Sequence, residues 1–324
     1  MILAIETSCD DTCAAVVDRD GVIRANVISS QGVHDRYGGV VPEVAARHHL
    51  ELVDVAVEDA LRRAQAGWDD VDLIAVTQGP GLVGALLIGL SEAKALAAAR
   101  DLPLAPVDHL QGHVAANFLA PEPFEPPFVC LIASGGHTLL ARVEDRHGFA
   151  VLGSTLDDAA GEAFDKGARM LGLGYPGGPA LQRLAEQGDP EAHAFPLAEG
   201  VEGLDFSFAG VKTALLYALR EDGRPSDADL AASYQHAIVE QLARRTERAL
   251  EETGLQRLAV GGGVAANALL RERLARIGVP THVPPRELCT DNAAMIASAA
   301  RYVAPLAPGE YLGLDAYASG ERGL

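Results

Sequence analysis

The sequence predicts an α/β protein made of two similar lobes, because one order of elements occurs twice along its 324 residues. Residues 2–29 read as three apolar strands, with a small polar turn after the first strand and the turn DRDG after the second. Residues 129–155 repeat this order, with DRHG at the matching place. Glycine at the end of each turn supplies the positive φ that a tight hairpin needs. Three such strands followed by strand–helix alternation, found twice, indicate two α/β lobes.

The rest of each copy alternates strands with helices. LIAVTQGPG (73–81) is a strand that enters a Gly-rich turn and a helix, and PLAPVDHLQGHVAANFLA (103–120) is a short strand followed by a helix. In the second copy, LAVGGGVAAN (258–267) and PTHVPPRELCTDNAAMIASAARY (280–302) take the same places. The last helix is expected to begin with Asp291 as its N-cap, since aspartate is favoured there.

The repeated order of elements predicts two lobes with a cleft between them. Lobe one is expected to cover residues 1–125, with the segment 303–324 returning to it, and lobe two to cover residues 126–302. The second copy contains a long helical insertion, residues 157–253. Because ligands of open α/β sheets collect at crevices beyond the strand ends, the site is expected in the cleft.

The composition restricts the partners. Hydrophobic residues make up 48% of the chain, so it is a globular protein, and the net charge is −19. An acidic surface repels polyanions, so a broad basic face for nucleic acid is excluded. Any RNA partner would need a local basic patch or a second subunit, and RNA binding by the chain alone is expected to be weak.

Cysteine use and the N-terminal segment favour the cytoplasm. The four cysteines form no C-x-x-C pair, which is typical of free thiols in a reducing compartment. The opening MILAIETSCDD has no basic region of the kind that begins a signal peptide. The most apolar window, residues 84–99, contains Glu92 and Lys94, so we expect a buried helix there and no membrane span.

His109 and His113 stand four residues apart, which places both imidazoles on one helix face. Two imidazoles and one carboxylate form a common open metal site. Asp291 occupies the matching place in the second copy, so we expect the three side chains to share an ion across the cleft. A zinc peptidase would need the pattern H-E-x-x-H, but Leu110 and Gln111 follow the first histidine, so the general base is missing.

Two strand-connecting turns have contrasting chemistry. ASGGHT (133–138) offers the hydroxyls of Ser134 and Thr138 and a flexible Gly-Gly backbone, which suits an anion, although a hairpin that merely needs glycine reads the same way. The matching turn ETSCDDT (6–12) is acidic, with Glu6, Asp10 and Asp11. Clustered carboxylates can orient metal-bound water or accept a proton, or simply form a solvated turn.

Further along the chain, GGGVAAN (261–267) lets a nucleotide approach bare backbone, and Asn267 is placed to hydrogen-bond a ribose or a base edge. The insertion contains a helix with Asp165 and Lys166, followed by the turn GYPGGP. Phe206 and Phe208 are either core residues or a pocket wall.

Two groups of charged side chains remain. The first group consists of arginines in the helical segments between residues 244 and 276. They either form a basic surface or pair with glutamates on solvated helix faces. These residues are Arg244, Arg245, Arg248, Arg271, Arg273 and Arg276. His48 and His49 point about 100° apart on a helix and are interpreted as surface residues.

Eight motifs in order, over about residues 1–315, resemble the TsaD family of tRNA threonylcarbamoyladenosine transferases. They are IETSCDDT, GGVVPEVAARHHLE, HLQGH, SGGHT, LDDAAGEAFDKGARMLGLGYPGGP, FSFAGVKT, GGGVAAN and CTDNAAMIA. The resemblance implies an actin-like ATPase (ASKHA-type) fold. It also implies transfer of a threonylcarbamoyl group from threonylcarbamoyl-AMP to the exocyclic amine of the adenosine beside the anticodon, in tRNAs that read ANN codons, with release of AMP.

The same resemblance implies roles for particular residues. The metal ligands fall on His109, His113 and Asp291, and the metal is iron, with zinc or magnesium as substitutes. Substrate contacts fall on Ser134, Gly135, Gly136, His137, Thr138, Asp165, Gly178 and Asn267, and a catalytic role falls on Asp10. Many members have an aspartate where this chain has Gln182, so the resemblance does not extend to that contact.

The implied mechanism needs no nucleophilic side chain, because the donor is already an activated mixed anhydride. The metal would act as a Lewis acid on the phosphate, the 134–138 turn would hold its oxygens, and positioning would supply most of the rate. The implied partners are a TsaB-like paralogue and a TsaE-like ATPase, and a homodimer is an alternative assembly.

Two other functions are compatible with the same fold, namely a metabolite kinase and a chaperone-like nucleotide switch. Both would bind phosphates in the cleft in the same way, but neither requires the His-His-Asp cluster.

Overall fold

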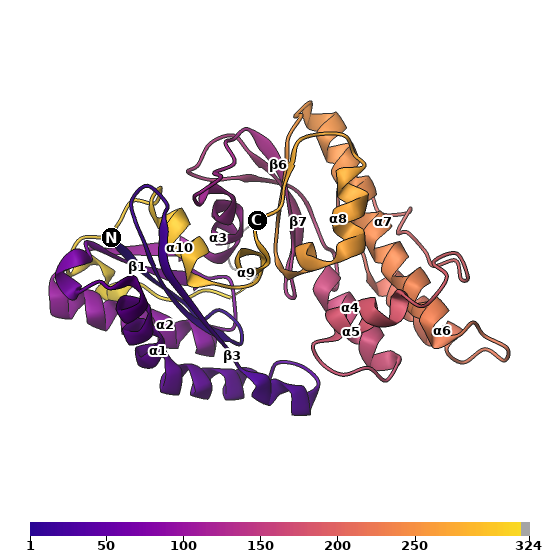
Figure 1. Ribbon diagram of the computed structural model, residues 1–324, viewed down its shortest axis with the longest axis horizontal. Coiled ribbons are helices and arrows are strands. Elements are labelled where there is room, and N and C mark those ends of the chain that lie inside the picture. The colour runs from indigo at the N-terminus through magenta and orange to yellow at the C-terminus, as the bar shows by residue number, and fades with distance from the viewer. Residues whose placement is uncertain (319–324) are drawn as a thin grey trace. The chain divides into compact units, whose positions relative to one another are not determined.

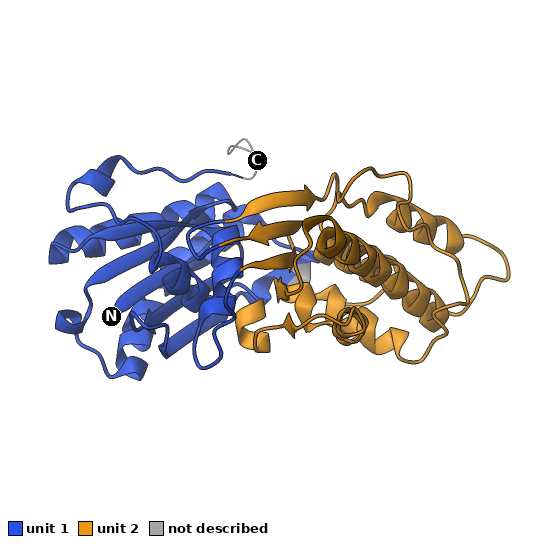
Figure 2. Cartoon of the chain, turned by 90° about the horizontal axis from the view of Figure 1, so that it is seen from above, with its two compact units in different colours: residues 1–126, 145–148, 290–324 blue, residues 127–144, 149–289 orange. Residues whose placement is uncertain are grey.

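The computed structural model describes residues 1–318, and the chain divides into two compact units. Unit 1 comprises Met1–Pro126, Asp145–Gly148 and Thr290–Leu324, and unit 2 comprises Pro127–Glu144 and Phe149–Cys289 (Figure 2). The last six residues of the segment expected to return to lobe one, 319–324, lie outside the described part of the chain.

Unit 1 contains a five-stranded sheet in the order β3-β2-β1-β4-β5. Its strands are β1 (Ile2–Glu6), β2 (Asp11–Val17), β3 (Ile23–Ser30), β4 (Leu73–Gly79) and β5 (Leu104–Asp108). The first three are antiparallel neighbours, whereas β1, β4 and β5 run parallel. The carboxyl ends of these three parallel strands therefore meet at one edge of the sheet, where ligands of α/β sheets collect.

Helices cover both faces of this sheet (Figure 1). On one face, α1 (Pro42–Ala64) and α2 (Val83–Arg100) pack against alternate residues of β1 such as Leu3 and Ile5. On the other face lie α3 (His109–Ala115) and α10 (Ala293–Ala300). Short 3-10 turns complete the unit: η1 (Gly32–Tyr37), η2 (Trp68–Asp70), η3 (Ala116–Phe118) and η5 (Glu310–Gly313).

Unit 2 repeats the plan of unit 1. Its sheet has the order β10-β9-β6-β7-β8, which is the order of the first sheet read from its other end. The strands are β6 (Phe128–Ala133), β7 (Thr138–Val143), β8 (Ala150–Ser154), β9 (Leu258–Gly261) and β10 (Thr281–His282). As in unit 1, β6, β7 and β8 are antiparallel neighbours, and β6, β9 and β10 run parallel. The prediction of an α/β fold with two similar units is confirmed.

The helical insertion is confirmed as part of unit 2. It contains α4 (Ala160–Met170), α5 (Gly177–Ala185), α6 (Ala209–Ala218) and α7 (Asp227–Thr253). The long α7 begins at a capping box of Ser226 with Asp229 and ends at Gly254, which has a φ of 71°. Its buried face packs against α4, α5, α6 and the strands β6 and β7. The remaining elements are η4 (Gly263–Ala266), α8 (Ala268–Ala275) and α9 (Arg286–Cys289).

The boundary between the units differs from the one expected from the sequence. The returning segment begins at Thr290, whereas we expected it to begin at residue 303. The reason is α10, which is buried on every side and contacts all five strands of unit 1 as well as α3. A helix that is apolar all round must lie in a core. Asp145–Gly148 also belongs to unit 1, because Gln111 donates to the carbonyl of His147 at 2.9 Å.

Gly262 connects β9 to the loop of unit 2 with a φ of +87°. A Cβ at this position would lie 2.3 Å from the carbonyl oxygen of Ala133. We expect Gly262→Ala to lower the free energy of unfolding by about 2–4 kcal/mol, because both the left-handed backbone and the contact resist a side chain. Gly200→Ala is the control, since a Cβ added to Gly200 would have no neighbour within 4 Å and its φ is ordinary. Equal denaturant midpoints for the two variants would contradict this account.

The predictions about membranes and cysteines have direct outcomes. Among residues 1–318, no helix combines the length and apolarity needed to cross a membrane. All four cysteines are free thiols. Phe206 and Phe208 are both buried and stack at 6.2 Å between ring centroids, so they belong to the core.

Candidate functional site

The histidine pair lies at the start of α3, directly after β5. Asp108 caps this helix, since its Oδ1 accepts hydrogen bonds from the backbone of Leu110 at 2.9 Å and of Gln111 at 3.1 Å. His109 and His113 are both buried, and their rings meet edge to face with centroids 4.7 Å apart. The spacing of four therefore places both imidazoles on one helix face, as predicted.

Asp291 joins the histidines from the loop that precedes α10. It is not the N-cap we expected: Asn292 caps the helix, with its side-chain oxygen accepting from the backbone of Met295 at 2.9 Å. The carboxylate of Asp291 is therefore directed elsewhere, and its Oδ1 lies 3.5 Å from Nε2 of His109 and 3.4 Å from Nε2 of His113. Gly112 allows this approach, because a Cβ there would lie 2.8 Å from the side chain of Ile296 on α10.

All three residues belong to unit 1. The expectation that imidazoles of one lobe and a carboxylate of the other share an ion was therefore wrong. Asp291 precedes α10 in the second sequence copy, so we assigned it to the second lobe. However, α10 packs on the sheet of unit 1 and brings Asp291 with it. The cluster is complete within one unit.

The geometry of this cluster fits a metal ion. The ligand atoms of His109, His113 and Asp291 all lie within 4.8 Å of one another. Two ligand atoms of a tetrahedral site with bonds of about 2.1 Å lie about 3.4 Å apart, close to the two distances from Asp291. Neither ring nitrogen of His113 has a hydrogen-bond partner among the described residues, although both are buried. Buried polar atoms normally have partners, and a metal ion would supply one.

The other ring nitrogen of His109 faces Glu6, which the sequence placed in an acidic turn but not beside His109. Nδ1 lies 3.0 Å from Oε2 of Glu6 and 3.2 Å from Oγ of Ser8. Burial alone would lower the pKa of His109, but the carboxylates of Asp291 and Glu6 raise that pKa to about 9. Burial would raise the pKa of Glu6, but His109 holds it below its ordinary value.

The β1–β2 loop contains the predicted catalytic residue Asp10. Its side chain is half-buried, and its carbonyl accepts from the backbone of Gln31 at 3.2 Å. Burial, assisted by Asp291 and Asp10, raises the pKa of the neighbouring Asp11 to about 7. Asp11 therefore titrates near neutral pH, which the sequence did not indicate.

His49 is buried, so its interpretation as a surface residue was wrong. Its Nδ1 lies 2.8 Å from the hydroxyl of Thr12, and its Nε2 lies 3.0 Å from the carbonyl of Cys9. These contacts tie α1 to the loop that carries Asp10. His48 is half-exposed and lies only loosely near Glu51, at 4.0 Å, so the surface interpretation holds for that residue.

Unit 2 contains a pocket of about 360 Å³ that collects four of the predicted substrate residues. They come from separate elements: Gly135 from the β6–β7 turn, Asp165 from α4, Gly178 from α5, and Asn267 from the start of α8. Pro176 of the GYPGGP turn also lines the pocket, and residues that we did not single out complete the lining, including Phe164, Arg183 and Arg286. The signal for them was their place beside the Gly–Pro-rich segments.

The β6–β7 turn uses its hydroxyls for its own structure. Oγ of Ser134 accepts from the backbone of His137 at 3.1 Å, and Oγ1 of Thr138 accepts from the backbone of Ala160 at 2.8 Å, at the start of α4. Gly135 and Gly136 are exposed, and a Cβ added to either would have no neighbour within 4 Å. The backbone of these two glycines is the part of the turn that a ligand can approach.

Gln182 and Asn267 organise one wall of this pocket. Oδ1 of Asn267 caps α8 by accepting from Leu270 at 3.0 Å, and its amide donates to Gln235 at 2.8 Å. Oε1 of Gln182 accepts from the backbone of Ala268 at 3.1 Å. Because that oxygen is engaged, Gln182 presents its NH₂ group, a donor, where an aspartate would present an acceptor.

The arginines of α7 and α8 do not form an open basic surface. Arg244 pairs with Glu240, Arg248 with Glu252 and Arg276 with Glu272. Arg273 pairs with both Glu240 and Glu247. Arg245 donates to the carbonyls of Gly203, Ala198 and Val201, and Arg271 donates to that of Ala265. Pairing with glutamates is therefore the correct alternative for four of the six arginines, whereas the other two are held by backbone carbonyls.

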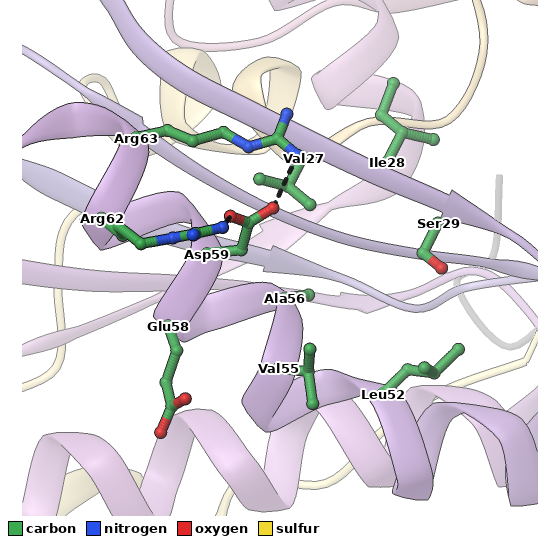
Figure 3. A pocket seen from close by; sticks show the side chains of 10 residues that line it. All are labelled: Val27, Ile28, Ser29, Leu52, Val55, Ala56, Glu58, Asp59, Arg62 and Arg63. Carbon is green, nitrogen blue, oxygen red and sulfur yellow. Dashed lines mark hydrogen bonds and ion pairs between the residues drawn. The ribbon is translucent and has the colours of Figure 1, made fainter.

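A larger hollow of about 720 Å³ lies in unit 1 between β3 and α1 (Figure 3). Its charged groups satisfy one another, since Asp59 pairs with both Arg62 and Arg63. None of the residues singled out in the sequence lines it. We therefore assign the chemistry to the His-Asp cluster of unit 1 and the pocket of unit 2, despite the greater volume of this hollow.

Solved structures share the fold of the chain at low sequence identity. Component A of (R)-2-hydroxyglutaryl-CoA dehydratase from Acidaminococcus fermentans matches with a TM-score of 0.57 and 16% identity, covering 93% of this chain and 96% of that one. HypF from T. kodakarensis matches with a TM-score of 0.61 and 16% identity, covering 92% of this chain and 46% of that one. These neighbours have the actin-like ATPase fold, which confirms the predicted fold class.

Curated relatives and a family model match at much higher similarity. A tRNA N6-adenosine threonylcarbamoyltransferase of Clostridium perfringens is 50% identical over 312 residues, covering 93% of this chain and 92% of the relative. One of Symbiobacterium thermophilum is 51% identical over 311 residues, covering 94% and 91%. The family model described as "TsaD: tRNA N6-adenosine threonylcarbamoyltransferase" matches residues 22–298. The chain therefore belongs to the TsaD family, whose members are transferases that modify tRNA.

Proposed function

We propose that this transferase uses threonylcarbamoyl-AMP as its donor and modifies the exocyclic amine of the adenosine next to the anticodon, in tRNAs that read ANN codons. The reaction releases AMP. The observation that carries the metal-assisted part of this proposal is the His109–His113–Asp291 cluster, whose spacing suits an ion with open coordination positions.

We propose iron as the ion, with zinc or magnesium as substitutes. Two imidazoles and one carboxylate with open positions are the ligand set of non-haem Fe(II) sites, and zinc accepts the same ligands. When bound, the ion supplies Lewis-acid stabilisation of charge on the donor phosphate. His109 and His113 would contribute neutral nitrogens, and Asp291 would contribute one negative charge.

The pocket of unit 2 is proposed to hold the AMP part of the donor. Asp165 would accept from the ribose, while Gly135, Gly136 and Gly178 leave room for backbone contact. Ser134, His137 and Thr138 would fix the turn whose amides face the phosphate. Asn267 is proposed to orient the nucleoside while it caps α8.

Asp10 is proposed to assist transfer from the β1–β2 loop. Its charge and that of Asp291 both act on Asp11, so these carboxyls lie within electrostatic range of one another. A carboxylate in this loop would accept the proton that the attacking amine loses. The donor is an activated anhydride, so the remaining requirement is positioning of the amine.

The partners proposed are a TsaB-like paralogue and a TsaE-like ATPase, with reaction in the cytoplasm. The net charge of −19 and the pairing of the α7 and α8 arginines with glutamates support shared tRNA docking. The test is to incubate the chain and these partners with threonylcarbamoyl-AMP and unmodified tRNA. Digestion and mass analysis then show whether the modified nucleoside forms. A phosphorylated small acceptor, or no modified nucleoside, would contradict the proposal.

We expect Asp165→Ala to weaken AMP binding about 10- to 100-fold, as for the loss of a charged hydrogen-bond acceptor. Metal binding should be unchanged, because the His-Asp cluster lies in unit 1 and Asp165 in unit 2. Calorimetric titration with AMP and with zinc measures both quantities. Asp222→Ala is the matched control, since Asp222 is an exposed aspartate of the same unit. Unchanged AMP affinity in Asp165→Ala would contradict the assignment of the pocket.

A further inference from the structure

A buried carboxylate lies next to the proposed metal centre but is not one of the three proposed ligands. Glu6 is the last residue of β1, and its side chain is fully buried. An ionised carboxylate is costly to bury unless it is paired and hydrogen-bonded. The partners of Glu6 therefore indicate what it is held for.

The sheet places Glu6, Thr77 and His109 side by side. Strands β1, β4 and β5 are parallel neighbours, Thr77 lies near the end of β4, and His109 follows β5 directly. Oε2 of Glu6 accepts from the hydroxyl of Thr77 at 2.5 Å and lies 3.0 Å from Nδ1 of His109. Oε1 of Glu6 accepts from the backbone of Ser8. Both carboxylate oxygens of Glu6 are thus held by hydrogen bonds, one from the backbone of Ser8 and one from the side chain of Thr77.

We propose that Glu6 is a positioning residue that holds His109 in the tautomer with its proton on Nδ1, so that Nε2 is presented to the metal. The inference rests on the proposed metal site. An ionised carboxylate can only accept hydrogen bonds, so the atom of His109 that faces Oε2 must carry a proton. A neutral imidazole carries one proton, and the lone pair then stays on Nε2, the atom 3.5 Å from Asp291.

Ser8 offers a competing explanation, since its hydroxyl lies 3.2 Å from the same Nδ1. A hydroxyl can donate or accept, so Ser8 alone would not select a tautomer. Glu6 can only accept, and it is held in place by Thr77. The structure therefore assigns the choice of the His109 tautomer to Glu6. Loss of an outer-sphere partner typically lowers metal affinity about 10- to 100-fold. We expect Ser8→Ala to change zinc affinity by no more than about threefold relative to the wild type.

The two histidines differ in this respect. His109 has a carboxylate behind it, whereas His113 has no hydrogen bond on either nitrogen among the described residues. Carboxylates behind a ligating histidine fix the ring and increase its basicity. His109 is therefore the pre-organised ligand of the pair.

Glu6→Gln is the sharpest variant. One end of the glutamine must be NH₂. The Oε1 position receives the Ser8 N–H, so the NH₂ falls at the position that faces Thr77 and His109. There it donates to Nδ1, which moves the ring proton to Nε2 and blocks the metal. We expect zinc affinity, measured by competition with a chromophoric chelator, to fall about 10- to 100-fold.

Val57→Ala is the stability control, because Val57 lies in the core of unit 1 on α1. It should lower the melting temperature but leave zinc affinity unchanged. A Glu6→Gln variant that melts earlier but binds zinc as tightly as the wild type would show a merely structural role and overturn the proposal. His113→Ala tests the metal site itself: if neither it nor the wild type binds zinc, the proposed function fails and not only the role of Glu6.

A spectroscopic readout on the wild type keeps the proposal testable if Glu6→Gln does not fold. In the zinc-loaded protein with ¹⁵N-labelled histidine, His109 should bind through Nε2 and show a protonated Nδ1. That proton should resonate farther downfield and exchange more slowly than any ring proton of His113. Zinc bound through Nδ1 of His109, or an Nδ1 proton that exchanges as fast as that of His113, would overturn the assignment.

Discussion

Replacing His113 with alanine is expected to remove the metal and to slow threonylcarbamoyl transfer at least about a thousandfold. His113 contributes one of three ligands, and its two nitrogens have no hydrogen-bond partner among the described residues. Two remaining ligands, His109 and Asp291, do not make a stable site for a catalytic ion, which usually has three protein ligands. A thousandfold loss corresponds to about 4 kcal/mol of barrier, in the range that a Lewis-acid ion supplies.

The measurement combines metal content with formation of the modified nucleoside in the complete system. His48→Ala is the matched control, because it removes an imidazole from the exposed side of α1 and leaves the cluster intact. We expect that variant to keep both its metal and its activity. Full transfer by a metal-free His113→Ala protein would show that the ion has no part in the reaction.

Zinc affinity is expected to rise about tenfold for each pH unit up to about pH 9. The pKa of His109 is raised from 6.5 to about 9, despite burial, by Asp291 and Glu6. Below that value the imidazole is protonated, and a metal ion must displace the proton from Nε2 before it binds. Between pH 6.5 and pH 8.5 the expected gain is therefore about a hundredfold.

Titrations with a chelator whose own protonation is accounted for measure this slope. Calorimetry in buffers of different ionisation enthalpy should show release of about one proton per zinc ion at neutral pH. An affinity that does not change over this interval would mean that His109 is already neutral, which contradicts its position between two carboxylates.

The same pKa gives the metal-free protein a pH-dependent stability. A histidine with a raised folded-state pKa stabilises the fold fully below its unfolded pKa of 6.5, and this contribution is lost as the pH rises to about 9. Its upper limit is about 3 kcal/mol, from the size of the pKa difference. Metal-free protein should therefore melt earlier at pH 9 than at pH 6.5, and bound zinc should reduce the difference.

The sequence predicted the parts of the fold that depend on local pattern. Three consecutive strands, with a glycine-ended turn after the second, appear twice, and the two sheets have the same strand order. Spacing alone placed His109 and His113 on one helix face, because the period of a helix is fixed. The turn around Gly135 was also recognised from its glycines, whereas Gly178 was implied only by the resemblance to the TsaD family.

What the sequence could not supply is long-range packing. The apolar helix Ala293–Ala300 must be buried, but its pattern does not say on which sheet it packs, and so Asp291 was placed in the wrong unit. His49 looked exposed because its partners, Thr12 and the carbonyl of Cys9, are remote in sequence. Glu6 was visible as a carboxylate that ends an apolar strand, and only the neighbouring strands revealed that it meets His109.

The most direct measurement is anomalous X-ray scattering from crystals of the metal-loaded protein, collected at the absorption edge of the ion. The account predicts one strong peak per chain, bonded to Nε2 of His109, Nε2 of His113 and a carboxylate oxygen of Asp291. A peak at any other group of residues, or a peak that leaves Asp291 unbound, would contradict it.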